Sequence, residues 1–167
     1  VRSVSLELVG KARQLAAGLG ERVGAVLACA DAGDRPGAIL AAGADVVYKI
    51  EHPLLACFDP MAHKKVIADL VARGRPQAML FGATPLGREL APRVAYACRC
   101  GLTADCTRLE LGDHAKGSLE LVGILKQTRP ALGGNIMATI MTKDSPCQMT
   151  TVRPGVFKAP LADRGRS

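Results

Sequence analysis

A glycine-rich segment has the spacing closest to a phosphate-binding loop in this sequence. Gly82 and Gly87 are separated by four residues, as the glycines of a P-loop are. Arg88 then stands where a P-loop has the lysine that reaches the phosphates, and Glu89 stands where it has the hydroxyl that binds magnesium. Because the Glu89 carboxylate would repel a triphosphate, we do not expect a nucleoside triphosphatase.

A threonine, an aspartate and an arginine are the next side chains that could do chemistry. Asp105 could act as a general base, but no histidine lies near it in the sequence. We expect instead that Thr103 and Asp105 lie at a turn and satisfy backbone donors at the entrance to a strand. Arg153 precedes Pro154, which favours extended backbone and leaves the guanidinium available for a two-point contact.

The cysteines raise the question of a metal site. Cys98 and Cys100 have one residue between them rather than two, no matching pair follows, and no histidine stands at zinc-finger spacing. We therefore expect no metal and six reduced, structural thiols, with a metal or redox role as the alternative. The thiols are those of Cys29, Cys57, Cys98, Cys100, Cys106 and Cys147.

The composition indicates a folded, basic chain. At 167 residues, with 49% hydrophobic and 22% charged residues, it can bury a core. The net charge of +7 can steer nucleic acid or acidic protein partners, but we expect a solvated basic surface instead. Nucleic-acid binding is not expected because the scarce aromatic residues lie far from the basic ones. The sequence contains no signal peptide, lipidation motif or membrane-length apolar run. We expect no membrane insertion and a cytoplasmic location, or the mitochondrial matrix in a eukaryote.

Helices and strands are expected to alternate over the first hundred residues. Apolar residues recur at helical spacing, and short apolar runs bounded by turn residues lie between them. Pro92 would interrupt a helix that begins near Pro85, so we expect a kink or a restart there. The expected helices are 3–18, 36–43 and 59–74, with another after Pro85, and the expected strands are 23–29, 45–50 and 77–81.

The last third of the chain has a different pattern. Strand-like runs at 106–111, 119–126, 135–142 and 148–152 are separated by turns, which predicts an antiparallel extension. Gly133, Gly134 and Asn135 could form a flavin- or phosphate-facing turn, or equally a bulge. The expected fold is α/β, with a mainly parallel Rossmann-like sheet of the adenine-nucleotide-hydrolase type flanked by helices. Residues 1–158 would form one domain, and 159–167 a linker stub or disordered tail.

Three motifs in the same order are similar to a known family. They are Ser5-Leu-Glu-Leu-Val-Gly-Lys-Ala-Arg-Gln-Leu-Ala16, then Gly82-Ala-Thr-Pro-Leu-Gly-Arg-Glu-Leu-Ala-Pro-Arg-Val-Ala95 with Gly101-Leu-Thr-Ala-Asp-Cys106, and finally Thr151-Val-Arg-Pro-Gly-Val-Phe157. Together they resemble the amino-terminal domain of the electron-transfer flavoprotein alpha subunit. In that family a second domain follows and carries FAD, and we expect this domain to be missing from the sequence, which stops at Ser167.

The resemblance implies a scaffold and dimerisation domain in a heterodimer that passes electrons from a dehydrogenase to an acceptor. It would be part of an electron carrier rather than an enzyme. FAD would belong to the intact complex and none to this fragment, with no catalytic or metal-binding residue here. The beta subunit would be the direct partner, and the candidate contact residues are Arg88, Arg93, Thr103, Asp105 and Arg153. The alternative is a stand-alone adenine-nucleotide-binding or sensor module of α/β fold.

Overall fold

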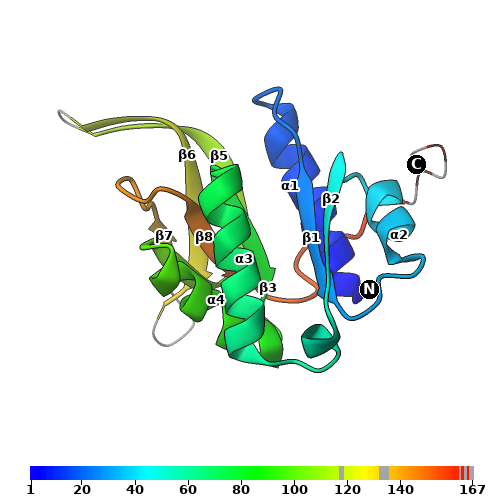
Figure 1. Ribbon diagram of the computed structural model, residues 1–167. Helices are drawn as coiled ribbons and strands as arrows, with labels where there is room; N and C mark the ends of the chain where they lie inside the picture. The colour runs from blue at the N-terminus through cyan, green and yellow to red at the C-terminus, as the bar shows by residue number, and fades with distance from the viewer. Residues whose placement is uncertain (117–118, 132–135, 162, 164, 166–167) are drawn as a thin grey trace. The chain divides into compact units, whose positions relative to one another are not determined.

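The computed structural model describes residues 1–116, 119–131, 136–161, 163 and 165 (Figure 1). The chain divides into two compact units, the first made of Val1–Arg73 with Phe157–Ser167 and the second of Gly74–Val156. The expectation of a single domain over 1–158 stays a prediction. Each unit is an α/β structure, as the sequence predicts, and the antiparallel sheet expected in the last third lies in the second unit.

The first unit contains a two-stranded parallel sheet with its connecting helices. Strands β1 and β2 pair in parallel from Gly24 opposite Val46 to Cys29 opposite Glu51. Val9, Ile39, Ala42 and Ala44 form its apolar core. The elements are α1 (Ser3–Ala17), β1 (Gly24–Cys29), α2 (Arg35–Ala41), β2 (Val46–Glu51), the 3-10 turn η1 (Pro53–Leu55) and α3 (Pro60–Gly74). All of the helices and strands expected from 3 to 74 are confirmed within a few residues.

Polar side chains fix the ends of these elements. The Asp59 carboxylate accepts a hydrogen bond from the backbone N–H of Ala62 at 2.6 Å, which confirms Asp59 as the cap of α3. Asp45 accepts from the N–H of Val23 at 2.8 Å and forms an ion pair with Arg13. These contacts join the start of β2 to the residue before β1 and to α1.

The last described residues pack on the first unit. The Lys11 ammonium lies 5.2 Å from the centre of the Phe157 ring, and the N–H of Asp163 donates to the carbonyl of Ala41 at 2.9 Å. Pro160 lies so close to α1 that a Cβ at Gly10 would stand 2.7 Å from its Cδ. Gly10 is therefore needed for this approach. Residues 162, 164, 166 and 167 of the expected tail lie outside the described residues.

The second unit contains a parallel sheet that positions the candidate site. Its strands are β3 (Ala78–Gly82), β4 (Leu102–Cys106) and β8 (Gln148–Val152), in the order β3-β8-β4, and α4 (Pro85–Ala97) connects β3 to β4. The assignment of 148–152 to the antiparallel extension was wrong, because β8 runs parallel to both neighbours. Every residue of β8 is buried, as a central strand requires. The strand β4 was not predicted.

An antiparallel sheet of three strands completes the second unit. Strands β5 (Arg108–Lys116), β6 (Leu119–Pro130) and β7 (Met137–Ile140) pair in that order, which confirms the expected extension. Figure 1 shows β5 and β6 as a long paired ribbon. Leu109 and Leu125 are fully buried and anchor this ribbon to the core. The turn expected at 133–135 lies outside the described residues.

Helix α4 runs without a break through Pro92, so the expected restart is wrong. Pro92 has no N–H to donate to the carbonyl of Arg88. Next to Pro92, however, Ala91, Val94 and Ala95 are at most 3% exposed and pack the helix on the sheet. Burial of this apolar face outweighs the cost of one missing hydrogen bond, as tertiary packing commonly does.

Candidate functional site

A bulge in β4 holds Asp105 in an unusual conformation. Thr103 pairs with Thr150, whereas Cys106 pairs with Val152, so β4 has one residue more than β8 over this interval. Asp105 has a φ of 59°, in the left-handed region where aspartate is better tolerated than most residues. Its N–H donates to the Thr151 hydroxyl at 2.8 Å. The bulge turns the Asp105 side chain out of the ladder at the carboxyl end of the sheet.

Two arginines converge on the Asp105 carboxylate. The Arg153 Nη2 lies 2.7 Å from one carboxylate oxygen and its Nε lies 3.3 Å from the other. The Arg88 Nη2 lies 3.6 Å from Asp105, while its Nε donates to the carbonyl of Ala83 at 3.0 Å. The hydrogen bond from Arg153 lowers the pKa of Asp105, and the charges of Arg153, Arg88 and Arg129 lower it further. The carboxylate is thus held ionised.

This arrangement corrects the expected roles of Thr103 and Asp105. The Asp105 carboxylate binds arginines rather than backbone donors, and both residues lie in strand β4 rather than at a turn. The sequence predicted that Arg153 is available for a two-point contact. It did not predict that the partner is Asp105, 48 residues earlier in the chain. Thr103 is only 3% exposed in the isolated chain. Its expected contact with a partner stays a prediction.

The first turn of α4 is closed by its own side chains. The Thr84 hydroxyl accepts from the N–H of Gly87 at 3.2 Å, and its carbonyl accepts from the N–H of Arg88 at 2.8 Å. A Cβ at Gly87 would stand 1.9 Å from the carbonyl oxygen of Gly82, so only glycine allows this strand-to-helix turn. A P-loop offers such N–H groups to phosphate. Here Pro85 has no N–H and the Thr84 hydroxyl occupies that of Gly87, whereas the N–H of Arg88 makes an ordinary helical bond, so few donors are left for a nucleotide at this turn.

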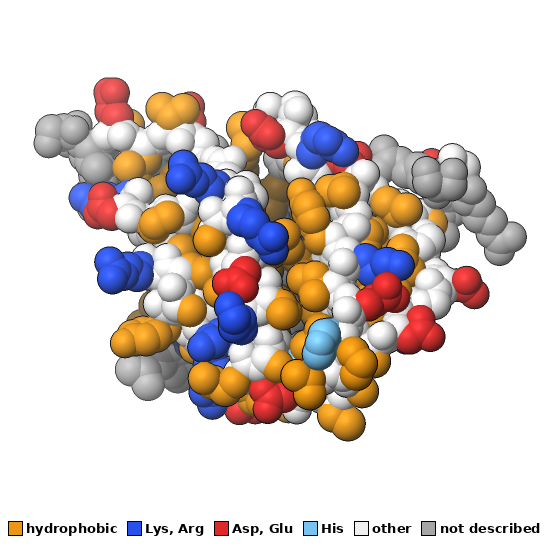
Figure 2. Space-filling model, in the orientation of Figure 1, with side chains coloured by type: hydrophobic (Ala, Val, Ile, Leu, Met, Phe, Trp, Pro, Cys, Tyr) orange, Lys and Arg blue, Asp and Glu red, His pale blue; other side chains and the backbone are white. Residues whose placement is uncertain are grey.

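A hollow of about 300 Å³ lies between α4 and β4, beside the two arginines. Figure 2 shows basic side chains interspersed with apolar ones over the second unit, which includes this helix. The Arg88 side chain is 62% exposed and the Arg153 side chain 48% exposed. The hollow thus combines apolar walls with a cationic rim. It is lined by Arg88, Pro92, Leu102, Ala104, Asp105 and Thr151.

Arg93 takes a different direction from Arg88. It pairs with Glu89 one turn earlier in α4, at 3.2 Å, and both side chains are 45% exposed. Because α4 is continuous, residues 88 and 93 lie on different faces of the helix. Arg93 is therefore outside the cluster around Asp105, and its role as a partner contact stays a prediction.

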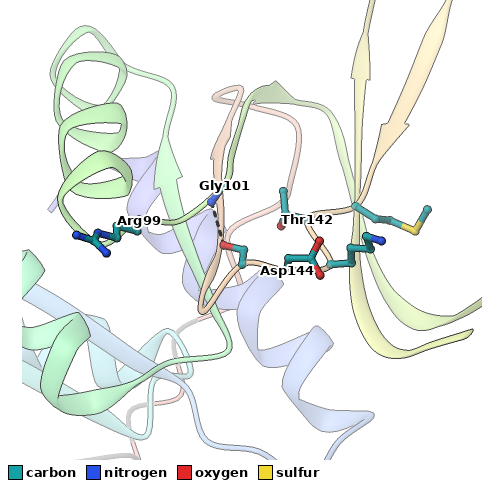
Figure 3. Close-up of a pocket in the computed structure, with 7 residues that line it drawn as sticks. Arg99, Gly101, Thr142 and Asp144 are labelled. Carbon is teal, nitrogen blue, oxygen red and sulfur yellow. Dashed lines mark hydrogen bonds between the residues drawn. The ribbon is translucent and has the colours of Figure 1, made fainter. Parts of the chain in front are cut away.

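A second, shallower hollow of about 400 Å³ lies where the segment after α4 meets the segment after β7 (Figure 3). The N–H of Gly101 donates to the Ser145 hydroxyl at 2.9 Å, and the Thr142 methyl lies so close that a Cβ at Gly101 would stand 2.7 Å from it. Arg99 points away from Thr142 and Asp144. The polar groups that line this second hollow do not converge on one point, so the hollow is the weaker candidate for a ligand site.

The thiols are free, and burial raises the pKa of three of them. Burial raises the pKa of Cys147 to about 12, with smaller contributions from Cys100 and Cys98. Burial also raises the pKa of Cys98 and of Cys106. Within the described residues, no group of three or more His, Cys, Asp or Glu side chains could hold a metal ion.

Sequence patterns did not reveal the polar interior of the second unit. Thr150 is fully buried and donates to the carbonyl of Thr103 at 3.1 Å. Gln148 accepts from the N–H of Leu125 at 2.7 Å, and the buried side chain of Gln127 has no hydrogen-bond partner among the described residues. The glutamine and the two threonines in 148–151 could have indicated a strand with polar cross-strand partners.

The fold and the cluster define an α/β module without an identifiable catalytic site in its described part, and comparison with known proteins defines its family. The model of the electron transfer flavoprotein domain matches residues 1–167. The chain belongs to this family.

Two relatives are electron transfer flavoprotein alpha subunits. That of Megasphaera elsdenii is 46% identical over 163 residues, which cover 98% of this chain and 46% of the relative. That of Thermoanaerobacterium thermosaccharolyticum is 43% identical over 164 residues, which cover 98% and 47%. A subunit of the lactate dehydrogenase (NAD(+),ferredoxin) of Acetobacterium woodii is 43% identical over 160 residues, covering 96% of this chain and 36% of the relative. The chain spans about half the length of the curated alpha subunits that it matches, or less.

Among the described residues, no helix is both long and apolar enough to cross a membrane.

Proposed function

We propose that this chain is the amino-terminal scaffold domain of an electron transfer flavoprotein alpha subunit, and that it docks on the beta subunit. The observation that carries the proposal is the match to the family over the whole chain, together with two alpha subunits that share more than 40% of their residues with it. The cluster of Asp105, Arg88 and Arg153 supplies exposed, charge-assisted hydrogen-bond donors for such a contact.

The turn at the start of α4 does not fit the pyrophosphate of a bound FAD. A flavin dinucleotide requires backbone or cationic donors for its pyrophosphate, usually at the start of a helix. At the start of α4, Pro85 has no N–H and the Thr84 hydroxyl binds that of Gly87, and the Asp105 carboxylate would repel a phosphate beside Arg88. In the proposal, FAD is therefore held by other parts of the complex, and this chain serves as a scaffold that docks on the beta subunit.

The proposal extends to the electron-transfer partners. The Acetobacterium woodii relative is a subunit of a lactate dehydrogenase that uses NAD(+) and ferredoxin. Assembly with a dehydrogenase is therefore consistent with this family, and we infer that the complex containing this chain passes electrons between a dehydrogenase and an acceptor.

Electron-transfer assays on the assembled complex test whether this chain serves subunit docking rather than the redox centre. The subunit that carries this sequence is combined with the beta subunit of the same organism, with Arg153 intact or changed to Ala. We expect weaker assembly of the variant but an unchanged rate at saturating beta subunit, because Arg153 holds the contact and not the flavin. Unchanged assembly with a collapsed rate at saturation would mean that the residue serves the redox centre, and the scaffold role would be wrong.

A further inference from the structure

We propose that the hollow between α4 and β4 receives an acidic segment of the partner subunit. One apolar side chain of that segment enters the hollow, and a neighbouring carboxylate pairs with Arg88 and Arg153. This inference rests on the proposed function, since it takes the beta subunit as the partner, and it adds the docking site and the chemistry that this site recognises.

The walls of the hollow suit an apolar side chain. Pro92 projects from α4, while Leu102 and Ala104 face the hollow from β4. The side chains of Pro92 and Ala104 are exposed in the isolated chain, and the volume is about 300 Å³. Covering such walls with an aliphatic side chain removes apolar surface from water on both partners. This contribution is independent of charge.

The rim of the hollow suits an added negative charge. Two guanidinium groups surround a single carboxylate, and the charge of Arg129 also lowers the pKa of that carboxyl. Asp105 uses two of the five donors of Arg153, and Ala83 uses one of those of Arg88. The remaining donors belong to side chains that are 48% and 62% exposed. One more carboxylate would reduce the local excess of positive charge.

The cationic rim is held in place before a partner arrives. Asp105 fixes Arg153 through two hydrogen bonds, and Ala83 fixes Arg88 through its Nε. Both arginines therefore lose less side-chain entropy on binding than free arginines would. The left-handed backbone at Asp105 is kept by the hydrogen bond to Thr151, which makes the bulge part of the same rigid element.

A small phosphate ligand fits these observations less well than a protein segment. The Asp105 carboxylate lies within 3.6 Å of Arg88 and 2.7 Å of Arg153, where it would repel the doubly charged phosphate. A phosphate would also leave the apolar walls formed by Pro92, Leu102 and Ala104 uncovered. A polypeptide satisfies both parts of the site at once.

The test measures association and dissociation rates between the full subunit that carries this sequence and the beta subunit of the same organism, at low and high salt. Arg88→Glu should lower the association rate constant at low salt by about tenfold and reduce its salt dependence, whereas Arg88→Lys should retain most of it. Ala104→Leu fills the hollow without changing charge and should raise the dissociation rate by about tenfold. Circular dichroism melting confirms that each variant is folded.

The matched control is Arg108→Glu. Arg108 lies in β5 and pairs with Glu110 at 2.6 Å, so the change makes the same difference in net charge at another arginine–carboxylate pair. Its rates should stay within about twofold of the wild type, because long-range steering alone changes association modestly. An equal effect of Arg108→Glu and Arg88→Glu would mean that only net charge matters, and the site would be wrong.

Other outcomes separate the docking site from the proposed function. Normal rates for both Arg88→Glu and Ala104→Leu, with tight wild-type binding, would overturn the site but leave the scaffold role standing. An absence of wild-type binding would overturn the scaffold role and the docking site with it. Competition by adenosine monophosphate or inorganic phosphate at constant ionic strength would identify a small anion as the ligand and overturn the acidic segment.

Discussion

The guanidinium of Arg153 donates two hydrogen bonds to the carboxylate of Asp105, 48 residues earlier in the chain. The pair joins the residue after β8 to the bulge in β4, and so fixes the carboxyl end of the parallel sheet. Because Asp105 also pairs with Arg88 of α4, one carboxylate connects two strands and a helix. The cationic rim of the proposed docking site is built around this carboxylate.

Replacing Asp105 separates its charge from its backbone conformation. Asp105→Asn keeps a residue that tolerates positive φ, whereas Asp105→Ala loses both the ion pair and that tolerance. We expect the asparagine variant to lose about 0.5–1 kcal/mol of unfolding free energy, since Arg153 is half exposed, and the alanine variant to lose about 1 kcal/mol more. Urea denaturation near neutral pH measures both, and equal losses would contradict the strain at this position.

The ion pair also predicts a dependence on pH. The pKa of Asp105 is lowered in the folded chain, mainly by the hydrogen bond from Arg153, so its contribution is complete above the unfolded value near pH 4. It is lost as the pH falls through the lower, folded pKa. The stability difference between wild type and Asp105→Asn should therefore shrink as urea denaturation is repeated at decreasing pH below about 4. A constant difference would mean that Asp105 is not the titrating group.

Gly87 and Gly37 make a contrasting pair of helical glycines. A Cβ at Gly87 would stand 1.9 Å from the backbone oxygen of Gly82, whereas a Cβ at Gly37 in α2 would meet nothing within 4 Å. Gly87→Ala should cost about 3 kcal/mol or more, as severe overpacking does. Gly37→Ala should instead raise stability by about 0.5–1 kcal/mol through helix propensity. Thermal melts measure the stability of both variants. An unchanged melting temperature of Gly87→Ala would show that the turn relaxes easily.

Two buried glutamines should respond in opposite ways to the same substitution. Gln127 is fully buried and its amide has no hydrogen-bond partner among the described residues, so Gln127→Met should raise the unfolding free energy by about 1 kcal/mol. Gln148 accepts from the N–H of Leu125, so Gln148→Met should lower it by about 1–3 kcal/mol. If chemical denaturation finds both variants destabilised, Gln127 has a polar partner in solution.

Cysteine reactivity should follow burial. Cys57 is exposed, whereas Cys147 is 1% exposed and burial raises its pKa to about 12. Because the thiolate is the reactive form, iodoacetamide at about pH 8 should label Cys57 at least about a hundredfold faster than Cys147. Mass spectrometry of peptides from the native protein gives both rates. Comparable rates would show that the segment around Cys147 opens readily.

Local signals in the sequence predicted most helices correctly. Asp59, Pro60 and Gly74 are a cap, a first-turn proline and a stop, and α3 follows them closely. Such signals act within one turn of helix, so they need no knowledge of the rest of the chain. The strands of the first unit were predicted for a similar reason, because each is a short apolar run between turn residues.

Long-range pairing could not be predicted in the same way. The position of β8 between β3 and β4 depends on contacts across about 50–70 residues, and its threonines do not form an apolar run. The bulge at Asp105 appears only once β4 and β8 are paired. The sequence thus indicated the residues of the candidate site, Arg88, Asp105 and Arg153, without showing which of them meet.

We propose that this chain docks on a beta subunit and holds no flavin of its own. Size-exclusion chromatography of the chain, alone and with the beta subunit of the same organism, tests it when protein and flavin absorbance are recorded together. We expect a colourless peak for the chain alone and co-elution with one beta subunit per chain after mixing. One equivalent of flavin in the chain alone, or separate elution of the two proteins, would contradict it.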